Sequence, residues 1–201
     1  MNLIADCNGK KLANDLQWLH EPLDWDFDNT GLRIVPHAPS DFFRPGDGPP
    51  NDNGALLYKH VTGDFTAVTH VTADLCDFGD AAALTVRASE SLWAKICLER
   101  SPIGEIAIVS VVTNPWSDDS NNELLTSAEC YMRLTRKGDI FGMHYSLGGK
   151  TWRFVRTFTM AMPPEVMVGI HAQAPFTGGC QVVFHSLTLS PEPVVDFRSG
   201  E

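Results

Sequence analysis

The chain has 201 residues, of which 43% are hydrophobic and 20% charged, a composition typical of a folded globular protein rather than a disordered one. Its formal net charge of −10 disfavours nucleic acid or an anionic membrane surface as a partner. We see neither a signal peptide nor a stretch of the about 18 apolar residues that a membrane span needs. Five scattered cysteines without a C-x-x-C pair favour reduced thiols, so we expect a cytoplasmic protein.

Short segments with strand-like alternation follow one another along the chain, and only Cys7–Leu19 has room for a short helix. Two polar segments, Pro36–Asn53 and Pro115–Ser127, interrupt the series and are expected to be long loops. The expected strands are Leu32–Pro36, Ala55–Lys59, Asp64–Leu75, Asp80–Ala88, Leu92–Arg100, Glu105–Asn114, Cys130–Lys137, Ile140–Leu147, Trp152–Phe158, Val166–Ala174 and Cys180–Leu189.

This succession of short strands separated by turn residues predicts an all-β protein, a two-sheet antiparallel β-sandwich or jelly roll. A chain of this length commonly forms one such domain, so we expect a single domain over residues 1–201 with its core at about 16–190.

Short motifs along the chain carry a resemblance to a known family. They are Trp18 with Glu21-Pro22, Asp41-Phe42-Phe43-Arg44, Asp52-Asn53-Gly54, Ala82 to Arg87, Trp93 to Glu99, and Val111 to Asn114 followed by Ser117 to Ser120. In this order and spacing they resemble the "regulation of enolase" family of concanavalin A-like proteins, also known as domain of unknown function 1349. The resemblance implies a concanavalin A-like lectin or glucanase fold, whose curved sheet binds ligands on its concave side. It implies no particular activity, because the family has none that is settled.

The alternation within Leu92–Arg100 separates its side chains onto two faces. The even-numbered side chains from 92 to 98 are apolar and are assigned to the core, so Trp93, Lys95 and Glu99 point the opposite way. The same argument adds Arg87 from Asp80–Ala88, and His171 and Gln173 from Val166–Ala174. The resemblance implies that one ligand-binding set shares the concave side: Arg87, Trp93, Lys95, Glu99, His171 and Gln173.

An aromatic ring beside hydrogen-bonding groups suits a carbohydrate or a small polar metabolite, which is the function we expect. A solvated ladder of ion pairs among Arg87, Lys95 and Glu99 is an alternative for the same residues. An enzyme of lyase, isomerase or hydrolase type, with Glu99 or His171 as the acid or base, is another. The family's name suggests a third alternative, a regulatory protein partner of a metabolic enzyme.

A standard glycosidase is disfavoured, although the question of catalysis stays open. Glycosidases of the superfamily carry paired carboxylates as E-x-D-x-x-E or E-x-D-x-E, whereas Glu99 has Cys97 two residues before it and no second carboxylate. The histidines are dispersed, and the acidic segment 117–123 lacks the glycine and spacing of a calcium loop. We therefore expect no metal and no cofactor.

Two pairs of residues in the proline-rich segment are assigned structural roles. Asp41 and Arg44 are expected to pair and hold this segment at a sheet edge. Asp52 and Asn53 are expected to form an Asx turn before Gly54. The identity of the ligand, the oligomeric state and the binding of a cation by the acidic segment 117–123 are left open.

Overall fold

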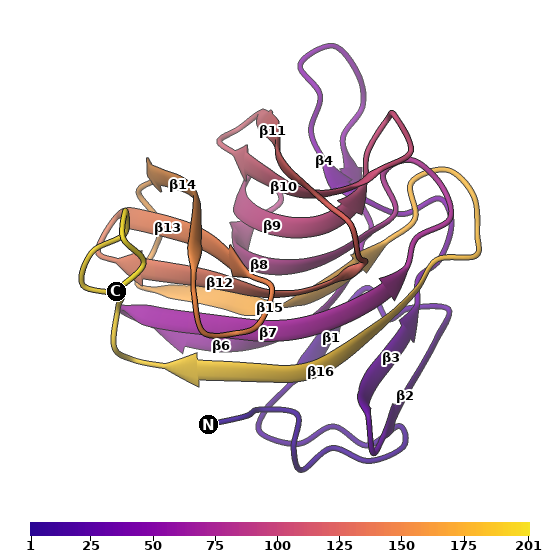
Figure 1. Cartoon of the computed structure of the whole chain (residues 1–201), viewed down its shortest axis with the longest axis horizontal. Helices are drawn as coiled ribbons and strands as arrows, with labels where there is room; N and C mark the ends of the chain where they lie inside the picture. The colour runs from indigo at the N-terminus through magenta and orange to yellow at the C-terminus, as the bar shows by residue number, and fades with distance from the viewer.

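The computed structural model describes residues 1–201 as two seven-stranded antiparallel sheets packed face to face (Figure 1). We call the sheet with this strand order the front sheet: β1 (Gln17–Leu19), β6 (Ala55–Thr62), β15 (Glu165–Gln173), β8 (Ala81–Ser89), β9 (Leu92–Arg100), β10 (Ile106–Thr113) and β11 (Ser117–Leu125). The back sheet has the order β14 (Arg153–Thr159), β13 (Ile140–Ser146), β12 (Glu129–Lys137), β7 (Phe65–Asp74), β16 (Gln181–Ser190), β3 (Gly31–Val35) and β2 (Asp24–Asp28). A separate two-stranded hairpin consists of β4 (Phe42–Phe43) and β5 (Asn51–Asp52). The predicted all-β sandwich is confirmed.

The core lies between the two sheets, where 37 buried residues form one apolar cluster. In β9 the cluster takes Ala94, Ile96 and Leu98, and in β8 it takes Leu84 and Val86, all with no exposed surface. Burying a side chain of this size contributes about 1.5–3 kcal/mol relative to leaving it in water. The period-two alternation of these strands therefore fixes which face of the front sheet is turned towards the core and which away from it.

Segment 115–127, expected to be a loop, contains the edge strand β11 instead. It pairs with β10, with Asp119 opposite Val111, although nearly all its side chains are exposed. From β14, Arg156 reaches Asp118 at 3.1 Å, and Arg153 pairs with Glu123. This segment is therefore held as a strand by backbone pairing and by these ion pairs. Its sequence lacks the apolar alternation from which a strand is predicted.

Segment Cys7–Leu19 forms no helix, because it folds as turns that lead into β1. Asn14 and Asp15 have φ values of 58° and 59°, a left-handed conformation that a right-handed helix does not accommodate. The structure contains no helix that is long and apolar enough to cross a membrane.

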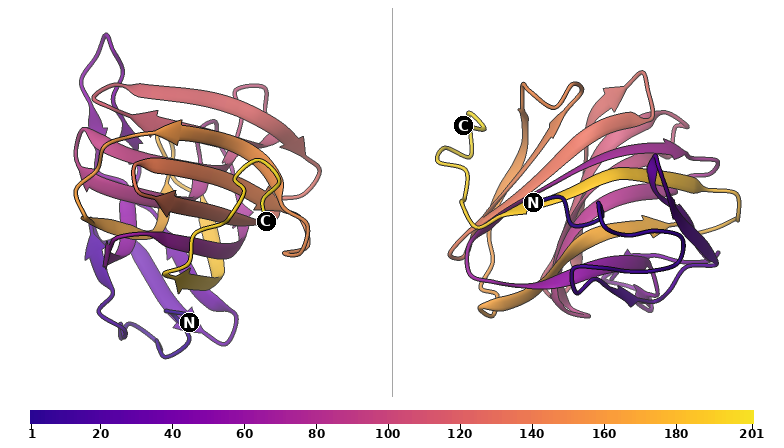
Figure 2. Two further views of the ribbon diagram at one scale, coloured as in Figure 1. Left: turned by 90° about the vertical axis from the view of Figure 1, so that its left-hand side faces the viewer. Right: turned by 90° about the horizontal axis from the view of Figure 1, so that it is seen from below.

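The β4–β5 hairpin crosses the face of the front sheet that is turned away from the core. At one side, the Ser40 amide donates to the Ala174 carbonyl at 2.9 Å, just beyond β15. At the other side, the Arg44 amide donates to Ser117 Oγ at 2.9 Å, at the start of β11. The loop at the tip of the hairpin projects beyond the sheets, as Figure 1 and the left-hand view of Figure 2 show. The hairpin therefore spans most of the width of the front sheet.

Candidate functional site

A second apolar cluster lies beneath the hairpin, on the outer face of the front sheet. Phe42 of β4 is fully buried there, with its ring centroid 4.5 Å from that of His171 and 6.2 Å from that of Trp93. The nine buried members of the cluster are Phe42, Leu56, Ala81, Ala83, Trp93, Cys97, Ala107, Val109 and Val111. Small residues at the centre of the sheet, Ala81 and Ala83, leave the space that the hairpin fills. The hairpin is thus packed against the sheet as part of the folded structure.

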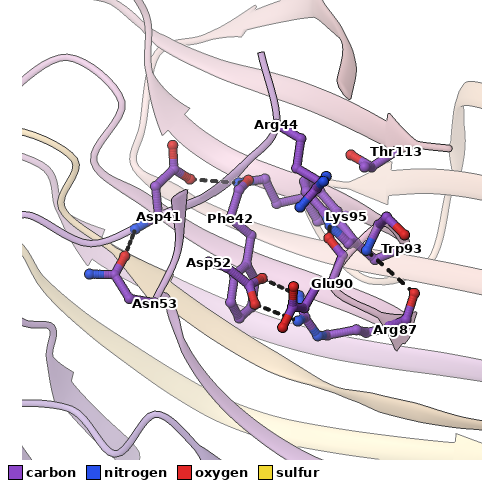
Figure 3. Close-up of polar contacts among 12 residues, drawn as sticks. Asp41, Phe42, Arg44, Asp52, Asn53, Arg87, Glu90, Trp93, Lys95 and Thr113 are labelled. Atoms are coloured by element: carbon purple, nitrogen blue, oxygen red, sulfur yellow. Dashed lines mark hydrogen bonds and ion pairs between the residues drawn. The ribbon is translucent and has the colours of Figure 1, made fainter. Parts of the chain in front are cut away.

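Two ion pairs hold the hairpin from below, one near each of its strands (Figure 3). Lys95 Nζ lies 3.0 Å from Asp41 Oδ1, and their side chains are only 2% and 14% exposed. Arg87 binds Asp52 through two parallel hydrogen bonds of 2.7 and 2.9 Å. Such bidentate pairs are among the stronger ionic contacts in proteins. The guanidinium also lies 4.7 Å from the centre of the Phe42 ring.

The Lys95 ammonium uses all of its hydrogen-bonding capacity within the protein. It donates to Asp41 Oδ1, to the Phe42 carbonyl at 2.9 Å and to Gln173 Oε1 at 2.6 Å. An ammonium has three donors, and all three are taken. Burial is the largest single effect on the pKa of Lys95 and lowers it, but Asp41, Cys97 and Glu99 together raise it by more, so the pKa is raised and the group stays charged.

His171 is enclosed under the hairpin and does not reach solvent. Both ring nitrogens are buried without a hydrogen-bond partner. Burial lowers the pKa of His171 well below its usual value, and the charges of Lys95 and Arg87 lower it further, so the ring is neutral. A Cβ on Gly54 would lie 2.2 Å from His171 Nε2, so only glycine fits beside this ring.

A pocket of about 230 Å³ opens beside the hairpin, between it and two loops at one end of the sheet. Phe78 and Phe176 form part of its wall, with stacked rings 5.5 Å apart that are 42% and 59% exposed as residues. The pocket is lined by Asp41, Phe43, Asn51, Phe78, Gly79, Lys95, Glu99, Val109, Val111, Asp119, Gln173, Pro175 and Phe176. Aromatic and apolar walls with a few convergent polar groups are typical of small-molecule sites.

Glu99 is the one partly buried polar group that lines the pocket and has no hydrogen-bond partner in the protein. The residue is partly buried, and no donor of the chain forms a hydrogen bond to its carboxylate. Burial raises the pKa of Glu99 to about 8, against the opposing effect of Lys95, and the charges of Asp41 and Asp119 raise it as well. A carboxyl group that titrates near neutral pH in a pocket is a frequent property of functional sites.

The structure divides the six residues of the expected ligand-binding set into two groups. All six lie on the front-sheet face turned away from the core. Lys95, Glu99 and Gln173 line the pocket, whereas Arg87, Trp93 and His171 are buried and do not. The Trp93 indole, with Nε1 donating to the Glu90 carbonyl at 3.1 Å, packs in the second cluster and offers no free face for a sugar ring. The ladder among Arg87, Lys95 and Glu99, given above as an alternative, is absent, because the two cations pair with hairpin aspartates.

Two expectations for the hairpin are wrong. Asp41 pairs with Lys95 rather than with Arg44, whose Nε donates to the Pro115 carbonyl at 3.0 Å. Asp52 binds Arg87 instead of forming an Asx turn, and Asn53 Oδ1 accepts the Asp41 amide at 3.1 Å. In each case a partner distant in the sequence replaces a local one.

The sequence reasoning missed the aromatic pair Phe78 and Phe176 and the roles of Asp41 and Asp52. A signal for the aspartates was present, since a lysine and an arginine on the same sheet face each need a carboxylate if they are buried. The family motifs around Asp41 and Asp52 supplied two acidic residues in the one segment long enough to reach them. Nothing comparable marks Phe78 and Phe176, which lie in separate loops.

The model of a family described as "Protein of unknown function (DUF1349)" matches residues 18–192. The "Regulation of enolase protein 1" of Saccharomyces cerevisiae is 27% identical over 175 residues, which are 86% of this chain and 88% of the yeast protein. These two matches confirm the resemblance inferred from the motifs.

Solved structures show the same fold. A functionally unknown protein from Saccharomyces cerevisiae superposes with a TM-score of 0.83 at 26% identity, over 89% of this chain and 97% of the other. A GH43 protein from Bacillus licheniformis gives 0.71 at 16% identity over 92% of this chain, which corresponds to 38% of that protein. Lectin I-B4 from Griffonia simplicifolia gives 0.58 at 11% identity, over 90% and 94% of the two chains. The last two similarities concern the fold alone.

Proposed function

The chain belongs to the DUF1349 family of proteins of unknown function, and from that premise we propose that it is a binding protein for a carbohydrate or small polar metabolite. The ligand is held in the pocket beside the hairpin. The observation that carries the proposal is the combination of stacked, half-exposed Phe78 and Phe176 with the unused carboxylate of Glu99 in one pocket. Aromatic faces cover the apolar side of a sugar or similar molecule, and the carboxylate accepts its hydrogen bonds.

The rest of the pocket supports a binding role. Asp41, Lys95 and Gln173 hold one another in fixed positions, so the polar base of the pocket is formed before any ligand arrives. Its volume of about 230 Å³ is below the ~300–1,000 Å³ of sites for drug-sized ligands, which favours a molecule of about one sugar ring.

Catalysis is the less favoured reading of the same pocket. Of the two acid/base candidates, only Glu99 lines the pocket, because His171 is enclosed beneath Phe42. A general acid or base must lie within hydrogen-bond reach of the substrate, which leaves Glu99 as the one group for this role.

The experiment compares binding by wild-type protein and two surface variants. Ligand-observed NMR against a panel of monosaccharides and small polar metabolites should give binders that are lost or strongly weakened in Phe176→Ala. Leu23→Ala removes a similarly exposed apolar side chain, 63% exposed, outside the pocket and should leave the same binders unchanged. Binders that respond equally in both variants, or a panel without binders, would contradict the proposal.

A regulatory interaction with a metabolic enzyme is a second candidate, favoured by one observation. The yeast relative, 27% identical along most of its length, is named for the regulation of enolase. Sedimentation velocity of this protein mixed with purified enolase would show a faster-moving species if the two associate, and unchanged separate boundaries would exclude a stable complex. A cytoplasmic location fits this candidate and the five unpaired cysteines.

A further inference from the structure

The hydrogen-bonding groups that line the pocket differ sharply in what they still have available. The single cation, Lys95, has donated all three of its N–H groups to Asp41, Phe42 and Gln173. Gln173 accepts from Lys95 and also donates to the Gly79 carbonyl at 2.9 Å. The base of the pocket therefore offers a ligand few donors and no available positive charge.

The available acceptors are carboxylates. Glu99 accepts no hydrogen bond from the chain, Asp119 lines the pocket from β11, and one oxygen of Asp41 is left over from its pair with Lys95. Three carboxylates against one ammonium give the ionised pocket a formal charge of −2. Once all three carboxylates are ionised, a ligand that carries a carboxylate or phosphate meets net repulsion here.

The aromatic walls suit the same class of ligand. The stacked, half-exposed rings of Phe78 and Phe176 line the pocket, and aromatic rings attract cations as well as apolar surface. A partly buried carboxylate without a donor has lost hydrogen bonds to water and has gained none from the protein. A charged donor on a ligand would supply the missing hydrogen bond.

We propose that the ligand of this pocket carries a protonated amino group that pairs with Glu99, as an amino sugar or amino polyol would provide. The inference rests on the proposed function, since it names the class of ligand for the same pocket. The overall charge of −10 adds a long-range attraction for such a cation.

Binding of such a ligand is linked to pH through Glu99. The groups that face this carboxyl are Lys95 on its own strand, Asp41 on the segment before the hairpin and Asp119 on β11. With a pKa of about 8, Glu99 is largely protonated at neutral pH, and an ammonium ligand must displace that proton. Its affinity should therefore rise as the pH increases from about 6 to about 8.

The test uses sorbitol, glucamine and gluconate, which share one polyol chain and end in a hydroxyl, an ammonium and a carboxylate. Isothermal titration calorimetry on the full chain should give an affinity for glucamine at least about tenfold higher than for sorbitol, and no binding of gluconate. Glu99→Gln should remove the tenfold preference. Glu105→Gln deletes an exposed carboxylate outside the pocket and should preserve it. Thermal unfolding of both variants at pH 6 checks that they are folded.

Each other result is decisive. If sorbitol binds as tightly as glucamine, or if gluconate binds best, the amine inference fails while the proposed binding function stands. If none of the three binds and the ligand-observed NMR panel also gives no binder, the inference and the proposed function fail together; if that panel gives binders but none that carries an amino group, only the inference fails. If Glu99→Gln keeps the preference for glucamine, Glu99 is not the partner of the amino group.

Discussion

Replacing Asp41 with asparagine tests whether the hairpin is held by a buried ion pair. The substitution keeps the shape of the side chain and removes its charge, so the Lys95 ammonium loses its counter-charge. Lys95 is 2% exposed and cannot recover hydration without moving the hairpin. We therefore expect a clear loss of stability.

The size of the loss follows from the surroundings of Lys95. Removing one partner of a fully buried pair costs about 3–5 kcal/mol. Here Asp41 is 14% exposed, and the ammonium keeps its hydrogen bonds to Phe42 and Gln173, so the loss falls at or just below the lower end of that range. We expect a loss of about 2–3 kcal/mol, which for a chain of this length lowers the midpoint of thermal unfolding by about 5–10 °C.

Urea unfolding at neutral pH, followed by tryptophan fluorescence, measures this difference. Asp15→Asn is the matched control, because Asp15 makes the same kind of contact with Lys59 at 3.1 Å but is 88% exposed, and it should cost less than about 0.5 kcal/mol. If Asp41→Asn is no more destabilising than this control, the ion pair beneath the hairpin does not contribute to stability, and the hairpin is not held by it.

Three further outcomes follow from the site. Gly54→Ala should cost about 2–3 kcal/mol by urea unfolding, because its Cβ would lie 2.2 Å from His171 Nε2; a neutral effect would mean that the ring moves freely. Trp93→Ala should cost about 3–5 kcal/mol, as expected of a fully buried aromatic, and wild-type stability would refute its place in the second cluster. Glu99 has a folded-state pKa of about 8, above the ~4.3 of an unfolded glutamate. Its contribution to stability is therefore fully present below pH ~4.3 and is lost as the pH rises through 8. Glu99→Gln should therefore lose less stability than wild type between about pH 5 and 9, and parallel pH profiles of the two proteins would contradict this.

The parts of the fold that could be predicted from sequence are the strands with one face buried in the core between the sheets and the other face turned away from it. In β9 the apolar residues alternate with others, so both its secondary structure and its orientation follow from the pattern. β11 is exposed on both faces, and all its residues before Leu124 are polar, so nothing in the composition of this stretch separates it from a loop. Its existence depends on the backbone groups that β10 leaves unpaired at the sheet edge, which is information about the fold rather than about the segment.

The same distinction applies to the candidate site. The alternation of β9 places Lys95 and Glu99 on one face, but it does not show that a hairpin covers part of that face. Trp93 was expected to be a platform for a sugar because it lies opposite the core, and it is instead covered by Phe42, more than 50 positions earlier in the chain. Contacts over such a separation leave no trace in the periodicity of either segment.

The two ion pairs under the hairpin also keep the pocket rigid, which affects how the proposed ligand would bind. Opening the hairpin would expose Phe42 and separate Lys95 from Asp41. The pocket is therefore formed before the proposed ligand binds. A preorganised site spends little binding energy on ordering its own side chains, and it tolerates few shapes. For the proposed ligand we therefore expect selective binding, with the backbone almost unchanged.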